Sequence, residues 1–473
     1  MPANSLCFQS INESAAQIAA GTLSPVELCH AYLEHIEARE PVLNAYIEVA
    51  GETAMKAAHV AEAEISRNGT RSPLHGIPLA HKDIIDVAGL PTSCGSRVLQ
   101  NNLASRNATV INRLEAAGAI VLGKLNMNEF ATLVPSEVFG PTVNPWNGAH
   151  SPGGSSSGSG VAVAAGLCAA ALGTDTGGSI RLPATFCGVT GLKATHGRIS
   201  SDGVVPLAWS LDHVGPLTRD ALDASLMYDA LAGFDAADLT SRDHALTSAS
   251  NLSDAQLHDL SDLRLAVPTN FFSELTDPQV ASALAAACDV FSDRGARIES
   301  IALPELDGLW SIADAIIGAE ASTSHAEHLR DRVHEYGEKV RKFLLRGQAA
   351  SAQDYVRARG AKARFKRKML SCLETFDALL VPGALIPAPP LGARTVNINN
   401  REISVLDAVI SATCPFNLSG QPALSLPSGF SSDGLPLGLQ IVCRPWQEHV
   451  ALRMGQAYQT ATDWHLQTPP ASA

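Results

Sequence analysis

Two loops rich in glycine and serine, which flank one segment of small apolar residues, constrain this chain more than any other feature. The first loop reads SPGGSSSGSG over residues 151–160, and the second reads GTDTGGSIRLPA over residues 173–184. Between them lies the apolar run VAVAAGLCAAAL, residues 161–172. Such loops serve either to bind phosphate through exposed backbone N–H groups or to carry a catalytic nucleophile. The residues around them separate these two uses.

Phosphate binding finds little support in the details of the loops. The chain contains no GxxxxGK[ST] motif, and the first loop has no GxGxxG that opens a helix after a strand. The formal net charge of −13 argues against a polyanionic partner, because phosphate binding requires clustered lysine and arginine. The basic cluster at residues 357–368 is interpreted first as the solvated face of a helix and only second as a binding patch. We therefore expect no nucleic acid as a partner.

Helices and strands are expected to alternate around the loops. The apolar run Ile77–Ala80 predicts a buried strand that ends at Lys82. Residues 109–117 place apolar side chains on one helical face, and Gly118 ends that helix before a second apolar strand. This succession is typical of α/β layering. The contents of 46% hydrophobic and 17% charged residues fit a globular enzyme.

Several serine and histidine residues are alternative candidates for catalytic or metal-binding roles. The stretch GSSSG at residues 154–158 matches GxSxG with Ser156 as its formal nucleophile, but no strand precedes it, as the nucleophile elbow requires. Asp212 and His213 leave a Ser-His-Asp triad open as the runner-up, although a histidine beside a turn is more often structural. The histidines at 325, 328 and 334 lack HExxH spacing, which favours a solvated helix face over a metal site.

Lys82 stands out because it follows an apolar strand. Burial there would disfavour the ammonium form and lower the pKa of the side chain. A pKa near 7 requires roughly 4–5 kcal/mol of differential stabilisation of the neutral amine, which desolvation between serine hydroxyls could supply. The structural alternative is a surface ion pair with Asp83 or Asp86. Composition alone favours that alternative.

Three motifs, taken together and in order, resemble the amidase signature family. They are GIPLAHKDIID at residues 76–86, the first loop at 151–160, and the stretch that begins with the second loop and runs to residue 200. The likeness continues in SLDHVGPLTRD and returns in GLPLGLQIV near the end, so it covers roughly residues 20–235 and 377–465. Three ordered motifs are far more specific than any one of them.

The resemblance implies an α/β fold, the amidase signature fold, with a large mixed β-sheet core covered by helices on both faces. We expect residues 1–473 to form a single amidase signature domain with its signature core at about 60–235. A variable subregion at about 240–410 is expected to form part of the substrate pocket, and residues 411–473 are expected to rejoin the core. The pocket walls are expected near residues 132–138, 310–345 and 414–417. No cofactor and no metal are expected.

The resemblance also assigns roles to individual residues. The family's Ser-cisSer-Lys triad corresponds here to Ser179, Ser155 and Lys82, with a cis peptide bond before Ser155. Ser179 is the implied nucleophile, which is activated through Ser155 by a neutral Lys82. The resemblance further implies an oxyanion hole and a group of supporting residues. The oxyanion hole consists of backbone N–H groups of Thr176, Gly177, Gly178 and Ser179, and the supporting residues are Ser156, Asp175 and Arg181.

The expected function is that of an amidohydrolase that cleaves a small-molecule amide, with an aryl amide or a carbamate as candidates, through an acyl-enzyme. The alternative is the A subunit of a glutamine-dependent tRNA amidotransferase. Two departures weaken the alternative: Leu182 and His213 stand where that protein usually has glutamine. The expected partners are a small-molecule amide and water, without nucleic acid or membrane, and a homodimer is left open. The lack of an N-terminal signal and of a long apolar run predicts a cytoplasmic protein.

Overall fold

The computed structural model describes residues 3–470 and shows a mixed α/β fold built on one large sheet. Eleven strands form this sheet in the order β1-β3-β2-β4-β6-β5-β12-β13-β9-β7-β8. The pairs β2/β3, β2/β4, β7/β8 and β7/β9 are parallel, and the remaining pairs are antiparallel. The predicted fold class, with a large mixed sheet, is confirmed.

The strands of the large sheet are short, and most are buried along their whole length. They are β1 (Tyr46–Val49), β2 (Pro78–Lys82), β3 (Ile120–Leu125), β4 (Ala170–Thr174), β5 (Thr190–Lys193), β6 (Val214–Thr218), β7 (Arg264–Pro268), β8 (Arg297–Ile301), β9 (Ala378–Pro382), β12 (Ala423–Phe430) and β13 (Pro436–Cys443). A separate antiparallel ribbon consists of β10 (Thr395–Ile398) and β11 (Arg401–Ser404).

Helices surround the sheet. The α-helices are α1 (Ile11–Ala19), α2 (Pro25–Leu43), α3 (Gly51–Asn68), α4 (Thr109–Ala117), α5 (Ser157–Ala164), α6 (Arg181–Cys187), α7 (Ala221–Leu231), α8 (Asp254–His258), α9 (Phe272–Leu275), α10 (Pro278–Asp293), α11 (Leu309–Ser324), α12 (Ala326–Asp331), α13 (Glu338–Gln348), α14 (Ala352–Cys372), α15 (Val405–Ile410), α16 (Cys414–Ser419) and α17 (Glu448–Gln459). Short 3-10 helices lie at Ala3–Phe8, Arg97–Leu99, Glu129–Ala131, Val333–Glu335 and Trp464–Leu466. No helix within residues 3–470 is long and apolar enough to cross a membrane.

Two neighbouring residues of β12 show that helices cover both faces of the sheet. The Leu424 side chain lies against Gly455 of α17, whereas the Ser425 hydroxyl lies 3.0 Å from that of Thr185 in α6. Successive side chains of a strand point to opposite faces. Helices α6 and α17 therefore pack on opposite faces, and the expectation of a sheet covered on both sides is confirmed.

The strands that lead to the two loops follow the expected pattern. Strand β2 ends at Lys82, as predicted, and α4 ends before Gly118, whose φ of 96° gives the left-handed cap that favours glycine. Strands β2 and β4 run parallel, with His81 opposite Leu172. Neighbouring parallel strands bring their carboxyl ends to one edge of the sheet. Lys82 and Thr174, the last residues of these strands, are therefore neighbours in space.

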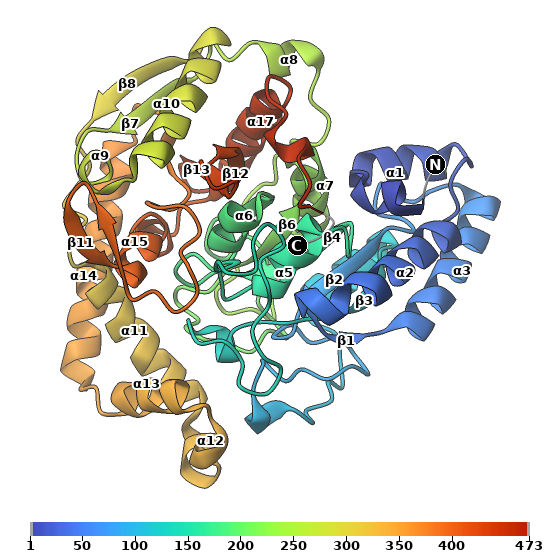
Figure 1. The fold of residues 1–473 in the computed structure, drawn as a ribbon, viewed down its shortest axis with the longest axis horizontal. Coiled ribbons are helices and arrows are strands. Elements are labelled where there is room, and N and C mark those ends of the chain that lie inside the picture. The colour runs from blue at the N-terminus through green and yellow to red at the C-terminus, as the bar shows by residue number, and fades with distance from the viewer. Residues whose placement is uncertain (1–2, 471–473) are drawn as a thin grey trace.

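The region at 240–410 extends the same sheet and adds a group of helices. Strands β9, β7 and β8 form one end of the sheet. Figure 1 shows β7 and β8 as yellow-green arrows, with α11 to α14 together below them. The basic cluster at 357–368 falls within α14, where Arg364, Arg367 and Lys368 are exposed. The division into a core at 60–235, a variable subregion at 240–410 and a rejoining segment at 411–473 within one domain stays a prediction.

Candidate active site

A hydrogen-bonded group of three side chains lies at the carboxyl ends of β2 and β4. The Nζ atom of Lys82 donates to the hydroxyl oxygens of Ser155 and Thr174, at 2.8 Å in each case. All three side chains are buried, and Lys82 and Ser155 have no exposed surface. The structure thus brings together two residues of the expected triad and adds Thr174 as a second partner of the lysine.

Burial changes the protonation of Lys82. Desolvation lowers the pKa of its amine from 10.5 to about 7, although Asp175 and Asp212 favour the charged form. The alternative of a surface ion pair with Asp83 is wrong, because Asp83 is buried and lies 3.0 Å from Lys124 instead. No carboxylate forms an ion pair with Lys82 among residues 3–470. Its amine is therefore suited to exist neutral near pH 7.

The loop that carries Ser155 is held against the second loop by Ser156. The peptide bond between Gly154 and Ser155 is cis, as the family resemblance implies. The Ser156 hydroxyl donates to the carbonyl of Thr174 at 3.1 Å and accepts from the N–H of the same residue at 3.2 Å. Its backbone N–H donates to the carbonyl of Ser179 at 3.3 Å. Ser156 therefore ties the two loops together, and its hydroxyl is engaged with backbone.

Ser179 lies in the second loop and faces a cavity. Its side chain is 6% exposed, and it lines the cavity together with Gly177 and Gly178. Within residues 3–470 its hydroxyl forms no hydrogen bond, including none with the Ser155 hydroxyl. The link between Ser155 and Ser179 in the expected triad therefore stays a prediction, whereas the link between Lys82 and Ser155 is present.

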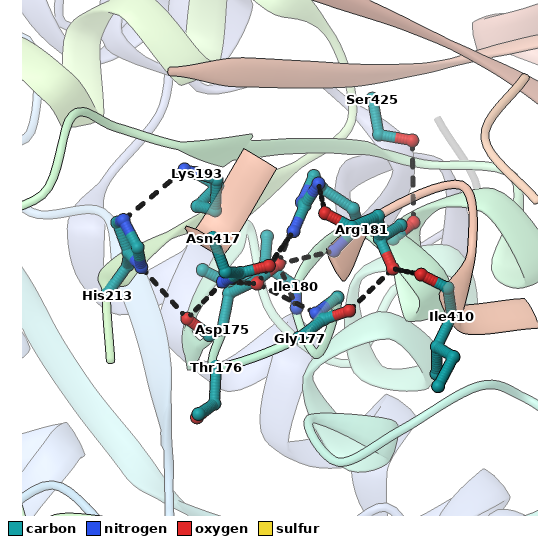
Figure 2. Close-up of polar contacts among 12 residues, drawn as sticks. Asp175, Thr176, Gly177, Ile180, Arg181, Lys193, His213, Ile410, Asn417 and Ser425 are labelled. Atoms are coloured by element: carbon teal, nitrogen blue, oxygen red, sulfur yellow. Dashed lines mark hydrogen bonds and ion pairs between the residues drawn. The ribbon is translucent and has the colours of Figure 1, made fainter. Parts of the chain in front are cut away.

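The carboxylate of Asp175 is the centre of a hydrogen-bond network in the second loop, as Figure 2 shows. It accepts hydrogen bonds from the backbone N–H groups of Gly178 at 2.9 Å and Ile180 at 3.2 Å. It also forms a buried ion pair with Arg181, with Nη2 of Arg181 at 2.9 Å from Oδ1. Burial alone would raise the pKa of Asp175, but the Arg181 guanidinium holds it well below its usual range. The lowered pKa keeps the Asp175 carboxylate ionised near neutral pH.

Arg181 connects this loop to the C-terminal part of the chain. The guanidinium is fully buried and donates to the carbonyl oxygen of Thr413 at 2.9 Å, to Oε1 of Gln440 at 2.9 Å and to Oδ1 of Asn417 at 2.6 Å. Asn417 also donates to the Asp175 carboxylate at 2.7 Å. Every donor group of the arginine thus has a partner, and the loop is fixed to α16 and β13.

The backbone N–H groups of the second loop divide into two sets. The N–H of Gly178 points to Asp175 and is occupied. The N–H groups of Thr176, Gly177 and Ser179 take part in no hydrogen bond within the described residues. Thr413 anchors this stretch, because its hydroxyl donates to the carbonyl of Gly177 at 2.6 Å. Of the four expected oxyanion donors, Gly178 is engaged, and the oxyanion role of the other three stays a prediction.

The rival Ser-His-Asp arrangement is not assembled. The two ring nitrogens of His213 lie 3.3 Å from Nζ of Lys193 and 3.1 Å from the carbonyl oxygen of Asp175, as Figure 2 shows. The Asp212 carboxylate accepts from the Thr176 hydroxyl at 2.6 Å. No serine hydroxyl contacts His213 among residues 3–470. Burial holds the pKa of His213 well below its ordinary value, so the ring is neutral.

The remaining histidines also lack a metal-binding arrangement. The expected solvated face is wrong for His325, which is buried with its Nδ1 3.0 Å from the Tyr336 hydroxyl. Desolvation lowers the pKa of His325 to about 4. Within the described part of the chain no group of three or more histidine, cysteine or acidic side chains could hold a metal ion.

The cavity above Ser179, here called the Ser179 pocket, has a volume of about 270 Å³ and mostly apolar walls. The expected walls at 132–138 and 310–345 contribute to it, but residues 414–417 do not. Asn417 is hydrogen-bonded to Arg181 and Asp175 instead, and Leu406 and Ile410 of α15 line the pocket. The large apolar side chains of the wall include Leu133, Leu182, Leu207, Trp310, Ile317, Phe343, Leu406 and Ile410.

Comparison with known proteins identifies the family of this chain. The family model described as Amidase matches residues 27–452. The chain belongs to the amidase family. It is an enzyme of the amidase class, which hydrolyses amide C–N bonds, and the family resemblance of its motifs is confirmed.

The proteins that this amidase resembles include amidotransferase A subunits and small-molecule or peptide amidases. It is 38% identical to the A subunit of glutamyl-tRNA(Gln) amidotransferase from Geobacter metallireducens, over 97% of this chain and 98% of the relative. A solved structure described as a vestigial protein complex that reveals the origins of an s-triazine catabolic enzyme is 31% identical, with a TM-score of 0.90 and coverage of 96% and 98%. The peptide amidase of Stenotrophomonas maltophilia is 30% identical, with a TM-score of 0.85 and coverage of 98% and 99%.

Several residues of this amidase site were not anticipated from the sequence. Thr174 had a usable signal, because it directly precedes Asp175 in the second loop. The partners of Arg181 had none, because Thr413, Asn417 and Gln440 lie more than 230 positions away in the chain. Only the folding of the C-terminal segment onto the loop brings them to the arginine.

Proposed function

We propose that this amidase hydrolyses small-molecule amides whose acyl group is apolar. The observation that carries the proposal is the Ser179 pocket, whose wall is made mainly of large apolar side chains. The charged residues in that wall, Asp314 and Arg346, neutralise each other through an ion pair of 2.9 Å. An apolar acyl group gains free energy on burial there, at about 25 cal/mol per Å² of apolar surface.

The chemistry follows from a proton relay. Neutral Lys82 accepts a proton from Ser155, which accepts one from Ser179 as the Ser179 oxygen bonds to the carbonyl carbon. The amide C–N bond then breaks, and the proton returns along the same path to the leaving nitrogen. Water attacks the resulting acyl-enzyme by the same route and releases the acid. The pKa of about 7 at Lys82 supports its role as the base.

The oxyanion would be bound by the free N–H groups of the second loop. Thr176, Gly177 and Ser179 supply candidate donors, whereas Gly178 fixes the loop through Asp175. Removal of one oxyanion donor in other enzymes costs about 10²–10³ in kcat, so a preorganised loop accounts for a large part of the rate. Asp175 and Arg181 act in this proposal as positioning residues.

The alternative function is that of the amidotransferase A protein, and the sequence relatives support it better than they support a small-molecule amidase. Glutamine carries an α-ammonium and an α-carboxylate, and both need charged or polar partners in a buried site. Leu182 and Ile410 present only apolar surface to the Ser179 pocket. This apolar wall favours an apolar acyl group over glutamine. We therefore place hydrolysis of apolar amides first and the amidotransferase role second.

The purified chain, assayed without partner proteins, tests both proposals. We expect it to hydrolyse butyranilide and related amides and to show low activity toward glutamine. Glutamine hydrolysis that requires added partner proteins, together with inertness toward every neutral amide, would instead establish the amidotransferase role. Membership in a homodimer and a cytoplasmic location stay predictions, to be measured by sedimentation and by cell fractionation.

The nucleophile is tested in the same assay. Ser179→Ala should abolish hydrolysis and remove the acyl adduct that mass spectrometry detects after reaction with an activated ester. Ser66→Ala is the matched control, because Ser66 is an exposed residue of α3 that lies outside the pocket and contacts no residue of the relay. A Ser179→Ala protein that still forms the adduct would assign the nucleophile elsewhere.

A further inference from the structure

A second cavity of about 480 Å³ adjoins the Ser179 pocket. The two cavities share Leu133, Leu182 and Leu406 in their walls. Gly153 and Gly154, which immediately precede Ser155, also line the second cavity. A substrate held at Ser179 therefore has room for one substituent on each side, and an acyl group in the Ser179 pocket leaves the second cavity empty.

The outer wall of this cavity is fixed to the serine-rich loop. The N–H of Ser151 donates to the carbonyl of Pro389, and the N–H of Leu391 donates to the carbonyl of Ala149, each at 2.9 Å. A further hydrogen bond of 2.9 Å runs from the N–H of Val405, the first residue of α15, to the carbonyl of Arg394. The backbone of residues 389–394 is therefore held at both ends, and this wall is built into the fold.

Charge distinguishes the two cavities. In the Ser179 pocket Arg346 is neutralised by Asp314. The second cavity is lined by one charged residue of the described chain, Arg394, and no acidic side chain within residues 3–470 forms an ion pair with it. An arginine guanidinium binds a carboxylate through two parallel hydrogen bonds. The second cavity is thus suited to an anionic substituent, whereas the Ser179 pocket is suited to a neutral one.

The relay decides which half of the amide enters which cavity. In the proposed mechanism Ser155 returns the proton to the leaving nitrogen, so the amine half lies on the side of Ser155. The second cavity opens beside Gly153 and Gly154, on that same side. The acyl half then remains in the Ser179 pocket, against Ile410 and Leu182.

We propose that the second cavity binds the amine half of the substrate and that Arg394 recognises a carboxylate on it. The substrate class is then an amide formed between an apolar carboxylic acid and an amino carboxylic acid. This inference rests on the proposed hydrolysis of amides with apolar acyl groups and adds the chemistry of the leaving group. Arg394 acts as a specificity-determining residue that contacts the substrate away from the reacting atoms.

Two amides that differ in one group provide the test. They are para-butyramidobenzoate, which carries a carboxylate on its amine half, and para-butyrotoluidide, which carries a methyl group there. We expect kcat/KM of the native enzyme to favour the benzoate by about tenfold, as for one hydrogen-bonded charged group at a partly exposed site. Arg394→Gln should remove this preference mainly through KM, and Arg394→Lys should restore part of it.

The matched control is Arg401→Gln, because Arg401 is an exposed arginine of β11 that lines neither cavity. It should leave both kcat/KM values within twofold. Equal effects of Arg394→Gln on the two amides, or no effect on either, would overturn the inference.

Binding to the inactive Ser179→Ala protein separates this inference from the proposed function. Calorimetry should show tighter binding of the benzoate than of the toluidide, and Arg394→Gln in the same background should abolish the difference. If the native enzyme hydrolyses the toluidide but Ser179→Ala binds both amides equally, the inference is wrong and the proposed function stands. If neither amide is hydrolysed, the proposed function fails, and the binding comparison alone decides about Arg394.

Discussion

The side-chain amine of Lys82 donates a hydrogen bond of 2.8 Å to the hydroxyl of Ser155, 73 positions later in the chain. The strand end at Lys82 and the turn before α5 place the two groups together in a region without exposed surface. A buried amine with a pKa of about 7 can accept a proton at neutral pH, which an exposed lysine does poorly. This contact is the structural basis of the proposed mechanism.

The first prediction concerns pH. Lys82 is the base only when neutral, and its pKa is lowered from 10.5 to about 7 by burial. The value of kcat/KM for a neutral anilide should therefore be constant well above pH 7 and fall about tenfold per pH unit well below it. Rates measured between pH 5 and 9 test this dependence. A profile that stays flat down to pH 5 would contradict the role of Lys82.

The second prediction separates the lysine relay from the histidine triad. Lys82→Ala should lower kcat by about 10²–10⁴, the usual contribution of a general base. His213→Gln should keep kcat/KM within about tenfold, because an amide can replace the polar contacts of a neutral ring that touches no serine. Circular dichroism checks the folding of both variants. An inactive His213→Gln beside an active Lys82→Ala would support the triad.

The third prediction concerns the buried ion pair of Asp175 and Arg181. Arg181→Met leaves the Asp175 carboxylate buried without its cation, and we expect the free energy of unfolding to drop by about 3–5 kcal/mol. Arg330→Met is the control, since Arg330 pairs with Asp331 at the surface, where solvent screens the ion pair and its loss should leave the free energy of unfolding nearly unchanged. Urea unfolding measures both changes. Equal shifts for the two variants would argue against a special role of the buried pair.

The fourth prediction concerns the size of the acyl group. Ile410 lines the Ser179 pocket and is 2% exposed, so Ile410→Ala enlarges the cavity. The ratio of kcat/KM for octananilide to that for butyranilide should rise several-fold, since each buried methylene contributes about 0.8 kcal/mol. Val356→Ala, which shortens an exposed apolar residue of α14 outside the pocket, should leave the ratio unchanged. An unchanged ratio in Ile410→Ala would place the acyl group elsewhere.

The local elements around the site follow closely from the sequence. The strand that ends at Lys82 and the helix that stops before Gly118 were predictable, because apolar periodicity and a glycine cap act within a few residues. The ordered motifs also indicated the family, the mixed sheet and the cis bond before Ser155. The pocket wall near residues 414–417 was placed wrongly, because nothing local shows whether a segment lies above or beneath a loop.

The sequence by itself determined which residue types stand at the candidate site, since Lys82, Ser155 and Ser179 belong to motifs that can be read along the chain. Only the tertiary structure decided how these groups are supported and what they face. Burial, which lowers the pKa of Lys82, results from strands packed around it, and Arg181 finds its partners in segments more than 230 positions away. Desolvation and long-range hydrogen bonds arise when distant segments pack together, so no local pattern encodes them.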